Sequence, residues 1–277
     1  EREGTRRSIA ALMDSIRYTL VGSGTAVPDA DRGPAAHHFA CGDLTAQCDL
    51  GSGTLRRLDA LGLPWFELDL VAITHRHQDH IADLLPLVFA MRHTPGVDRV
   101  RPLTLLGYEG FANDLEALAA VFGGWVLDPG FPLEIRERSD TPIEIERGDT
   151  WIEIDARPVV HTPEAVGYRL TLAASGREVV VAYTGDTEEC PEAVDLARDV
   201  DLLVTECSVA DEDRVRGHLT PGGVGRVAAG AAVRRLVATH FYPSALALGP
   251  EEIERRIRES YARGPVDLGV DGLCIDL

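Results

Sequence analysis

Residues 74–80 read Thr-His-Arg-His-Gln-Asp-His, and this stretch decides both the fold and the chemistry that we expect. Three histidines and one aspartate fall within positions 75 to 80, directly after the apolar run Leu68–Ile73. In an extended segment, positions 75 and 77 point the same way, so both imidazoles can reach one ion. Asp79 and His80 would lie in the turn that opens the next helix, displaced enough to serve a second ion. Imidazole and carboxylate without thiolate are typical ligands of open Zn²⁺, Fe²⁺ or Mn²⁺ sites.

The composition narrows the chemistry further. The chain has 277 residues, of which 45% are hydrophobic, so it can bury a sizeable core. All 27 basic residues are arginine, which excludes a P-loop lysine, a Schiff-base lysine and a lysine general base. The formal net charge of -18 argues against a non-specific nucleic-acid binder, because an acidic surface repels phosphate backbones.

The sequence also indicates the compartment. No stretch approaches the roughly 20 apolar residues that a membrane span requires. The cysteines are odd in number and lack C-x-x-C spacing, which favours free thiols in a reducing compartment over a disulfide framework. They are Cys41, Cys48, Cys190, Cys207 and Cys274. We therefore expect a soluble, cytoplasmic protein that does not interact with membranes.

Strand and helix patterns alternate without a break in composition, which predicts a single α/β domain over residues 18–277. A short amphipathic helix is expected in an N-terminal extension over residues 1–17. The expected strands are Tyr18–Val21, His38–Cys41, Leu44–Leu50, Leu68–Ile73, Leu103–Leu106, Trp151–Ala156, Ala165–Leu172, Glu178–Tyr183, Leu202–Thr205, Leu236–Thr239 and Leu273–Leu277. One helix is expected to begin after Gly53. Further helices are expected over Ile81–Arg92, which would be kinked at Pro86, and over Gly110–Phe122, Pro191–Ala197, Pro221–Ala232 and Pro250–Ala262.

Three further residues follow apolar, strand-like runs: His161 in Val-Val-His-Thr-Pro, Asp186 in Tyr-Thr-Gly-Asp-Thr, and His240 in Ala-Thr-His-Phe-Tyr. With the histidine-rich stretch, they make the chain resemble the metallo-β-lactamase superfamily from about residue 18 to 277. The resemblance implies a four-layered αβ/βα sandwich. It also implies one metal ion on His75, His77 and His161, a second on Asp79, His80 and His240, and Asp186 shared by both.

Such a site would hold two divalent ions, with Zn²⁺ favoured by the histidines and Mn²⁺ or Fe²⁺ as alternatives. A metal pair of this kind generates a hydroxide nucleophile and holds both oxygens of an in-line displacement. We therefore expect a metal-dependent hydrolase of ester bonds in which a metal-bridging hydroxide attacks the substrate. Asp79 is expected to contribute to catalysis as well as to metal binding.

Within the superfamily, the chain most resembles ribonuclease Z and its phosphodiesterase and arylsulfatase-like relatives. The matching segments are residues 21–28, 49–54, 184–187, 205–207, 217–221 and 239–241. In that group a histidine near the position of His218 protonates the leaving oxygen, and Glu206 is the candidate to orient it. An exposed loop histidine beside a helix start is the alternative interpretation of His218.

Contacts to substrate are less well defined. Gly51 and Ser52 could offer backbone N–H groups to an anion at a helix start, or could form an ordinary tight turn. His38 follows a loop that approaches the site in relatives, and we expect it to contact substrate. Asp49 either holds a ligand imidazole in place or bonds only to local backbone. The segments Thr94–Pro102 and Gly123–Pro132 are expected to form pocket walls.

Two departures concern the substrate. Many bacterial ribonuclease Z enzymes carry a long RNA-gripping arm between the third histidine ligand and the shared aspartate, but here Asp186 follows His161 by only 25 positions. The early loop also lacks the Arg-Asn form of those nucleases. We therefore predict hydrolysis of a small phosphodiester or related ester. The alternatives are ribonuclease Z-type processing of transfer RNA 3′ ends, hydrolysis of lactones, carboxylic or sulfate esters, and a non-catalytic metal- and ligand-binding sensor. A homodimer is expected from the relatives.

Overall fold

The structure, a computed structural model, describes residues 15–277. Most of the helix expected over residues 1–17 therefore lies outside the described residues. Its last two positions, Ile16 and Arg17, belong instead to the first strand, β1 (Ile16–Gly22). Ile16 is buried there, and Arg17 forms an ion pair with Asp276 across the neighbouring strand. Within the described residues, no helix combines the length and the apolar character needed to cross a bilayer.

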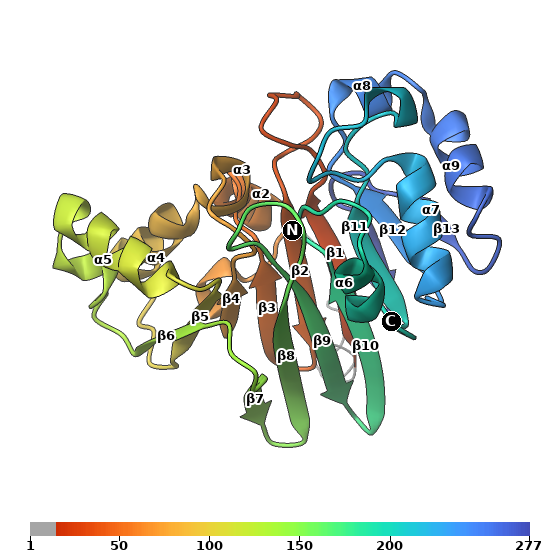
Figure 1. The fold of residues 1–277 in the computed structure, drawn as a ribbon. Coiled ribbons are helices and arrows are strands. Elements are labelled where there is room, and N and C mark those ends of the chain that lie inside the picture. The colour runs from red at the N-terminus through yellow and green to blue at the C-terminus, as the bar shows by residue number, and fades with distance from the viewer. Residues whose placement is uncertain (1–14) are drawn as a thin grey trace, which may run out of the picture.

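Two seven-stranded mixed sheets pack face to face (Figure 1). In spatial order the first consists of β14 (Cys274–Asp276), β1, β2 (Ala36–Cys41), β3 (Leu44–Cys48), β4 (Leu70–Ala72), β5 (Leu103–Gly107) and β6 (Leu133–Glu137). The second consists of β13 (Val266–Leu268), β12 (Leu236–Thr239), β11 (Leu202–Glu206), β10 (Arg177–Tyr183), β9 (Val166–Ala174), β8 (Thr150–Pro158) and β7 (Ile143–Arg147).

Helices cover the outer faces of both sheets. On the side of the first sheet are α2 (Thr54–Ala60), α3 (Gln78–Ile81), α4 (Leu84–His93) and α5 (Phe111–Phe122). On the side of the second are α6 (Pro191–Leu196), α7 (Pro221–Gly230), α8 (Pro243–Leu246) and α9 (Pro250–Arg258), and Figure 1 shows α7 and α9 beside β12 and β13. The resulting order of helix, sheet, sheet and helix confirms the predicted αβ/βα sandwich.

Two apolar cores hold these layers together. The larger lies between the sheets and joins residues such as Phe39 and Leu70 of the first sheet to Leu170 and Val181 of the second. The smaller lies between the second sheet and α6, α7 and α9, where Leu203 meets Val227 and Ile257. Burial of apolar surface on both faces explains why the central strands are nearly continuous apolar runs.

Part of each sheet is parallel, and this positions the site. Strands β3 to β6 run parallel, as do β10 to β13. The carboxyl ends of parallel strands lie at one edge of a sheet, where α/β proteins place ligand-binding residues. His75 follows β4, Asp186 follows β10 and His240 follows β12.

The prediction for Ile81–Arg92 was wrong in one respect. The segment is not one helix kinked at Pro86, because α3 ends at Ile81 and α4 begins at Leu84. Pro86 is the third residue of α4. Residues in the first turn have no intrahelical acceptor for their N–H, so a proline there removes no hydrogen bond and causes no kink.

Candidate metal centre

The segment after β4 brings four candidate ligands to one point. His77 has an extended backbone and directly precedes α3, so the chain turns sharply between His77 and the two residues that follow Gln78. That turn buries Asp79 and His80, while His77 stays exposed. The Nε2 atom of His75 lies 2.9 Å from Nδ1 of His77, so both imidazoles converge as the alternating pattern predicts.

The second sheet supplies the other three residues from three different connections. His161 follows β8, Asp186 follows β10 and His240 follows β12. The backbone of His240 has a φ of 57°, in a left-handed region that is strained for a residue with a β-carbon. Its N–H donates to the carbonyl of Ser23 in the loop after β1, which fixes this conformation.

These residues form two adjoining groups. Donor atoms of His75, His77, His161 and Asp186 lie within 4.8 Å of one another, and so do those of Asp79, His80 and His240. Asp186 lies between the groups. Its Oδ2 is 3.8 Å from Nε2 of His161, and its Oδ1 is 3.5 Å from Nε2 of His80 and 3.5 Å from Nδ1 of His240.

Hydrogen bonds to residues outside the ligand set orient four of the imidazoles. Nδ1 of His80 lies 2.7 Å from Oδ2 of Asp49, and Nδ1 of His75 lies 3.0 Å from Oγ1 of Thr74. His161 contacts the carbonyl of Gly217 at 2.9 Å, and His240 contacts Oγ of Ser208 at 3.0 Å. Such partners fix the ring tautomer and are the usual companions of metal-binding histidines.

Asp49 both holds a ligand imidazole and bonds to nearby backbone, the two roles that its position in the sequence left open. Besides contacting His80, its carboxylate accepts hydrogen bonds from the backbone N–H and hydroxyl of Thr74 and from the hydroxyl of Tyr183. A fully buried carboxylate needs partners of this kind, and these hold it rigidly against His80. Sequence reasoning did not identify Thr74, Ser208 or Gly217, although Thr74 directly precedes His75.

The donor set fits divalent cations. Nε2 of His80 and Oδ1 of Asp186 are buried and have no hydrogen-bond partner among the described residues, which is costly unless another group satisfies them. Five imidazoles and two carboxylates without a cysteine suit Zn²⁺, Mn²⁺ or Fe²⁺.

The electrostatics of the cluster agree with that fit. Burial, followed by the neighbouring His80, lowers the pKa of His75, and burial lowers the pKa of His161, so both rings are neutral as a ligand must be. Burial alone would raise the pKa of Asp79, but its hydrogen bond with His240 and the charge of His80 lower it overall. Burial would lower the pKa of His80, yet the charges of Asp186 and Asp49 raise it, so this position attracts positive charge.

His218 lies beside the ligand cluster and is held by Glu206. Nδ1 of His218 is 3.1 Å from both carboxylate oxygens of Glu206, and 4.0 Å from Oδ2 of Asp186. Glu206 is itself fixed by the backbone N–H groups of Thr187 and Leu219. Burial lowers the pKa of His218, but the hydrogen bond and charge of Glu206 outweigh burial and raise it to about 9. The arrangement is that of a proton donor oriented by a carboxylate.

A family model described as the Beta-lactamase superfamily domain matches residues 54–241, about two thirds of the chain. The chain belongs to the metallo-β-lactamase superfamily. It is 30% identical to ribonuclease Z of Mycobacterium marinum over 92% of this chain and 96% of that protein. The ribonuclease Z of Mycobacterium bovis has the same identity and coverage. The chain is therefore a metal-dependent hydrolase of this superfamily, near ribonuclease Z.

Solved structures of the superfamily share the fold. The Bacillus subtilis metallo-β-lactamase fold protein YhfI superposes with a TM-score of 0.75 at 23% identity, covering 95% of this chain and 100% of that chain. The short form of human tRNase Z superposes with a TM-score of 0.69 at 20% identity, covering 94% of this chain and 98% of that chain.

The residues predicted to contact substrate differ in their accessibility in the structure. His38 is 1% exposed and pairs with Gln47 in the adjacent strand, while its neighbour His37 faces Tyr18 and Tyr183 between the sheets. Neighbouring strand residues point to opposite faces, so His38 lies on the face of β2 opposite to His37, where its burial keeps substrate from reaching it. The N–H of Gly51 already donates to the carbonyl of Ala35, so it cannot bind an anion.

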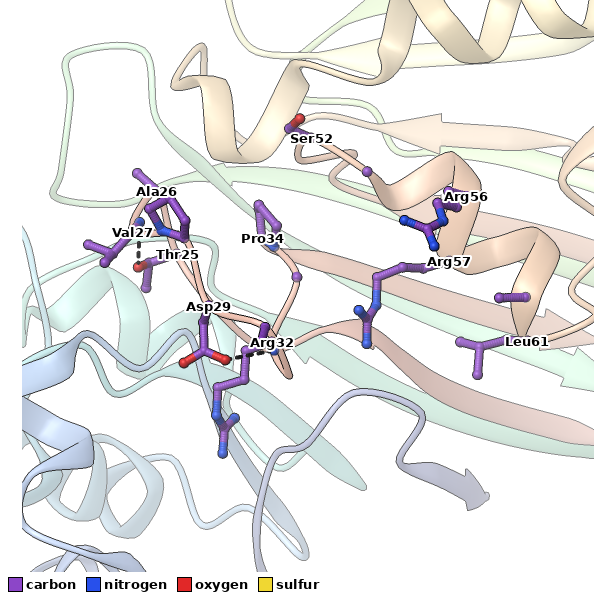
Figure 2. A pocket seen from close by; sticks show the side chains of 15 residues that line it. Thr25, Ala26, Val27, Asp29, Arg32, Pro34, Ser52, Arg56, Arg57 and Leu61 are labelled. Atoms are coloured by element: carbon purple, nitrogen blue, oxygen red, sulfur yellow. Dashed lines mark hydrogen bonds between the residues drawn. The ribbon is translucent and has the colours of Figure 1, made fainter.

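Ser52 is exposed and lines a cavity of about 640 Å³. Figure 2 shows the cavity between the loop Thr25–Pro34 and helix α2, with Arg56 and Arg57 on one side and Asp29 and Arg32 on the other. The loop borders the ligand cluster, because the carbonyl of Ser23 at its base accepts the N–H of His240.

The segments Thr94–Pro102 and Gly123–Pro132, predicted to form pocket walls, contribute no residue to the cavities described at Ser52, His218 and His77. Arg99 instead binds the carbonyls of Phe66 and Leu68, and Trp125 packs against Phe89 of α4. The cavity beside His77 has other walls, which include Arg76, Asn113 and Glu164.

Proposed function

We propose that the protein is a binuclear metal-dependent phosphodiesterase that acts on a small phosphodiester. The observation that carries the proposal is the pair of adjoining ligand groups that meet at Asp186, with His218 beside them on Glu206. This arrangement combines sites for two cations with a proton donor, which is what hydrolysis of a phosphodiester requires.

His75, His77 and His161 would hold one ion, Asp79, His80 and His240 the second, and Asp186 both. Zn²⁺ suits the histidine-rich ligands best. When bound, such a pair of ions supplies Lewis acidity toward the phosphate oxygens and nucleophilic water at neutral pH.

The chain's own groups then divide the proton transfers. His218 carries a proton at neutral pH and would donate it to the departing oxygen, while Glu206 keeps its Nδ1 side fixed. Asp79 remains a carboxylate, since its pKa is lowered, so its Oδ2 can accept a hydrogen bond from the attacking water and orient it. Ser52 and the cavity that it lines would accommodate one arm of the substrate.

The absence of an RNA-gripping arm supports a small substrate. Between His161 and Asp186 the described chain forms only β9, β10 and their connections, and the two strands are joined by a tight turn at Ser175 and Gly176. The net charge of -18 further disfavours a long polyanion, whereas two divalent ions would attract a single phosphodiester locally.

Bis(p-nitrophenyl) phosphate provides the test. The zinc-loaded protein should hydrolyse it, and His77→Ala should abolish turnover. His93→Ala is the matched control, because His93 is exposed and outside both ligand groups. Absence of turnover in a sample shown to contain two equivalents of zinc would overturn the proposal, and a parallel panel of lactones and sulfate esters would then identify the bond cleaved.

Transfer-RNA 3′ processing is the second candidate. It is favoured by the 30% identity to Mycobacterium marinum ribonuclease Z over nearly the whole chain. Incubation with a precursor transfer RNA that carries a 3′ trailer separates the two: site-specific release of the trailer at nanomolar enzyme supports the nuclease, and hydrolysis of small diesters alone supports our proposal.

We also infer that the enzyme works in a reducing compartment such as the cytoplasm. All five cysteines are free, and four of them are buried. Unpaired, buried thiols are typical of proteins that fold in reducing conditions. Homodimerisation stays a prediction that sedimentation of the full chain can measure.

A further inference from the structure

A cavity of about 380 Å³ adjoins His218 on the side of the loop that leads from β11 to α7. Its walls include His218, Arg214, Arg216 and the carboxylates Glu188 and Glu189. Arg214 and Arg216 are exposed and lie four and two positions before His218 on the same loop. The cavity thus shares its wall with the residue that we place at the leaving oxygen.

The charged side chains of this cavity differ in whether they have hydrogen-bond or ion-pair partners. Glu189 is paired with Arg226 through two contacts, at 2.8 and 2.7 Å, and Glu188 accepts the N–H of Gly217. In contrast, Arg214 and Arg216 form no hydrogen bond or ion pair among residues 15–277, although the charge of Arg214 adds to that of Arg226 in lowering the pKa of Glu189. In a chain with a net charge of -18, two unpaired guanidinium groups on one short loop are conspicuous. A guanidinium fork matches a phosphate group in shape and charge.

The cavity beside the ligand His77 has the reverse character. It is lined by Glu109, Glu137 and Glu164, and Arg76 is the one arginine among the described residues that line it. That arginine is already paired with Asp114 and Glu164, each at 3.3 Å. A second anionic group on the substrate would be repelled at this end and attracted at the end next to His218.

We propose that Arg214 and Arg216 form a binding subsite for a second phosphate, carried by the alcohol that leaves during hydrolysis. The inference rests on the proposed function, because it takes His218 as the donor to the leaving oxygen. It names the substrate class more closely: a phosphodiester whose leaving alcohol is itself phosphorylated, such as a nucleoside phosphate. An alcohol that receives a proton from His218 would lie next to this cavity, whose walls carry both guanidinium groups.

Calorimetric titration of the zinc-loaded protein tests the subsite without turnover. Adenosine 3′,5′-bisphosphate should bind about tenfold more tightly than either adenosine monophosphate, as one added charge-assisted contact would give. The gap should close as salt is raised, because exposed charges are screened. In Arg214→Ala/Arg216→Ala the three nucleotides should bind with equal affinity, while Arg263→Ala, which removes an exposed arginine outside this cavity, should keep the gap.

Two results would overturn the subsite: equal affinities in the unmodified protein, or a gap that survives the double substitution. Either can occur while bis(p-nitrophenyl) phosphate is still hydrolysed, so the subsite can fail without the phosphodiesterase. Loss of that hydrolysis in the unmodified, zinc-loaded protein would instead count against the proposed function. Because both arginines are exposed, unchanged thermal unfolding of the double variant serves as the check on its fold.

Discussion

The two ligand groups differ in how the protein surrounds them. Asp79, His80 and His240 are all buried, and two of them are held by side chains behind them, Asp49 and Ser208. In the other group His75 and His161 also have partners behind their rings, but the side chain of His77 is exposed and, among the described residues, contacts other imidazoles of the cluster. One group is therefore wholly buried, and the other opens to solvent at His77. We expect the buried group to bind its ion more tightly and the open group to exchange its ion more readily.

The largest effect should come from Asp186, which lies between the two groups and which we propose both ions share. In Asp186→Asn one carboxylate oxygen becomes an amide nitrogen, which cannot coordinate a cation, so the affinities for both ions should fall together. Activity should fall at least about a thousandfold, since several kcal/mol of stabilisation are lost. Metal analysis after gel filtration measures the outcome. Retention of one full equivalent would contradict a shared role for Asp186 and assign it to one group.

The next effect concerns His218, which belongs to neither of these two groups, although its donor atom lies within 4.8 Å of those of Asp186 and His240. His218→Ala should lower kcat by about 10²- to 10⁴-fold, the usual contribution of a general acid, and leave the metal content unchanged. A loss of metal in this variant would instead make His218 a ligand.

The pH profile gives an independent measure of His218. Its pKa is raised to about 9, so the donor is protonated below that pH and the activity should decline as the pH rises through it. Bound cations nearby would lower this pKa, so the decline should lie at or below about pH 9. Glu206→Gln removes the charge that raises the pKa, and should move the alkaline limb to lower pH. An unmoved limb would exclude His218 as its source.

The third effect should separate the two groups. Asp49→Asn replaces a carboxylate that accepts from Thr74, Tyr183 and His80 with an amide that also donates. The affinity of the buried group for zinc should fall about 10- to 100-fold, and that of the open group should fall less, because Asp49 reaches His75 only through the hydroxyl of Thr74. Competition with a chromophoric chelator resolves the two equivalents. Asp69→Asn, another buried carboxylate, whose partner is Arg147, should cost stability without changing either affinity.

The sequence predicts ligands that lie in one stretch more directly than ligands that the fold brings together. Four ligands lie in one stretch after a strand, so their convergence is a local property that residues 75–80 display directly. His161, Asp186 and His240 come together only because β8, β10 and β12 end at the same edge of the second sheet. Their partners could not be predicted from spacing alone, because Ser208 reaches His240 across 32 positions of the chain.

The errors have physical causes of the same kind. The sequence left Gly51 open between an anion contact and a tight turn, and its N–H donates to the carbonyl of Ala35, 16 positions earlier in the chain. The strands β6, β7 and β13 were missed. β6 and β7 lie at sheet edges, and each alternates two apolar residues with charged ones, while β13 has only three residues. Short edge strands owe their conformation to the neighbouring strand more than to their own residues.

The smallest effect probes the support behind the buried group. Tyr183 is buried, and its hydroxyl donates to Oδ2 of Asp49 at 2.6 Å. Tyr183→Phe should cost about 1–3 kcal/mol of unfolding free energy, since one hydrogen bond to a charged acceptor is lost. It should also lower the zinc affinity of the buried group, but by less than Asp49→Asn does, because Thr74 still holds the carboxylate of Asp49.

Tyr168→Phe is the matched control for this last variant. Tyr168 is equally buried, and its hydroxyl donates at 2.6 Å to the carbonyl of Ile73, a neutral acceptor that does not contact the ligands. Denaturant unfolding should show a lower unfolding free energy in both variants, whereas chelator competition should show a lower zinc affinity only in Tyr183→Phe. If the two variants retained equal zinc affinity, the rigidity of the buried group would not depend on the hydroxyl behind Asp49, and the contrast between the two groups would rest on burial alone.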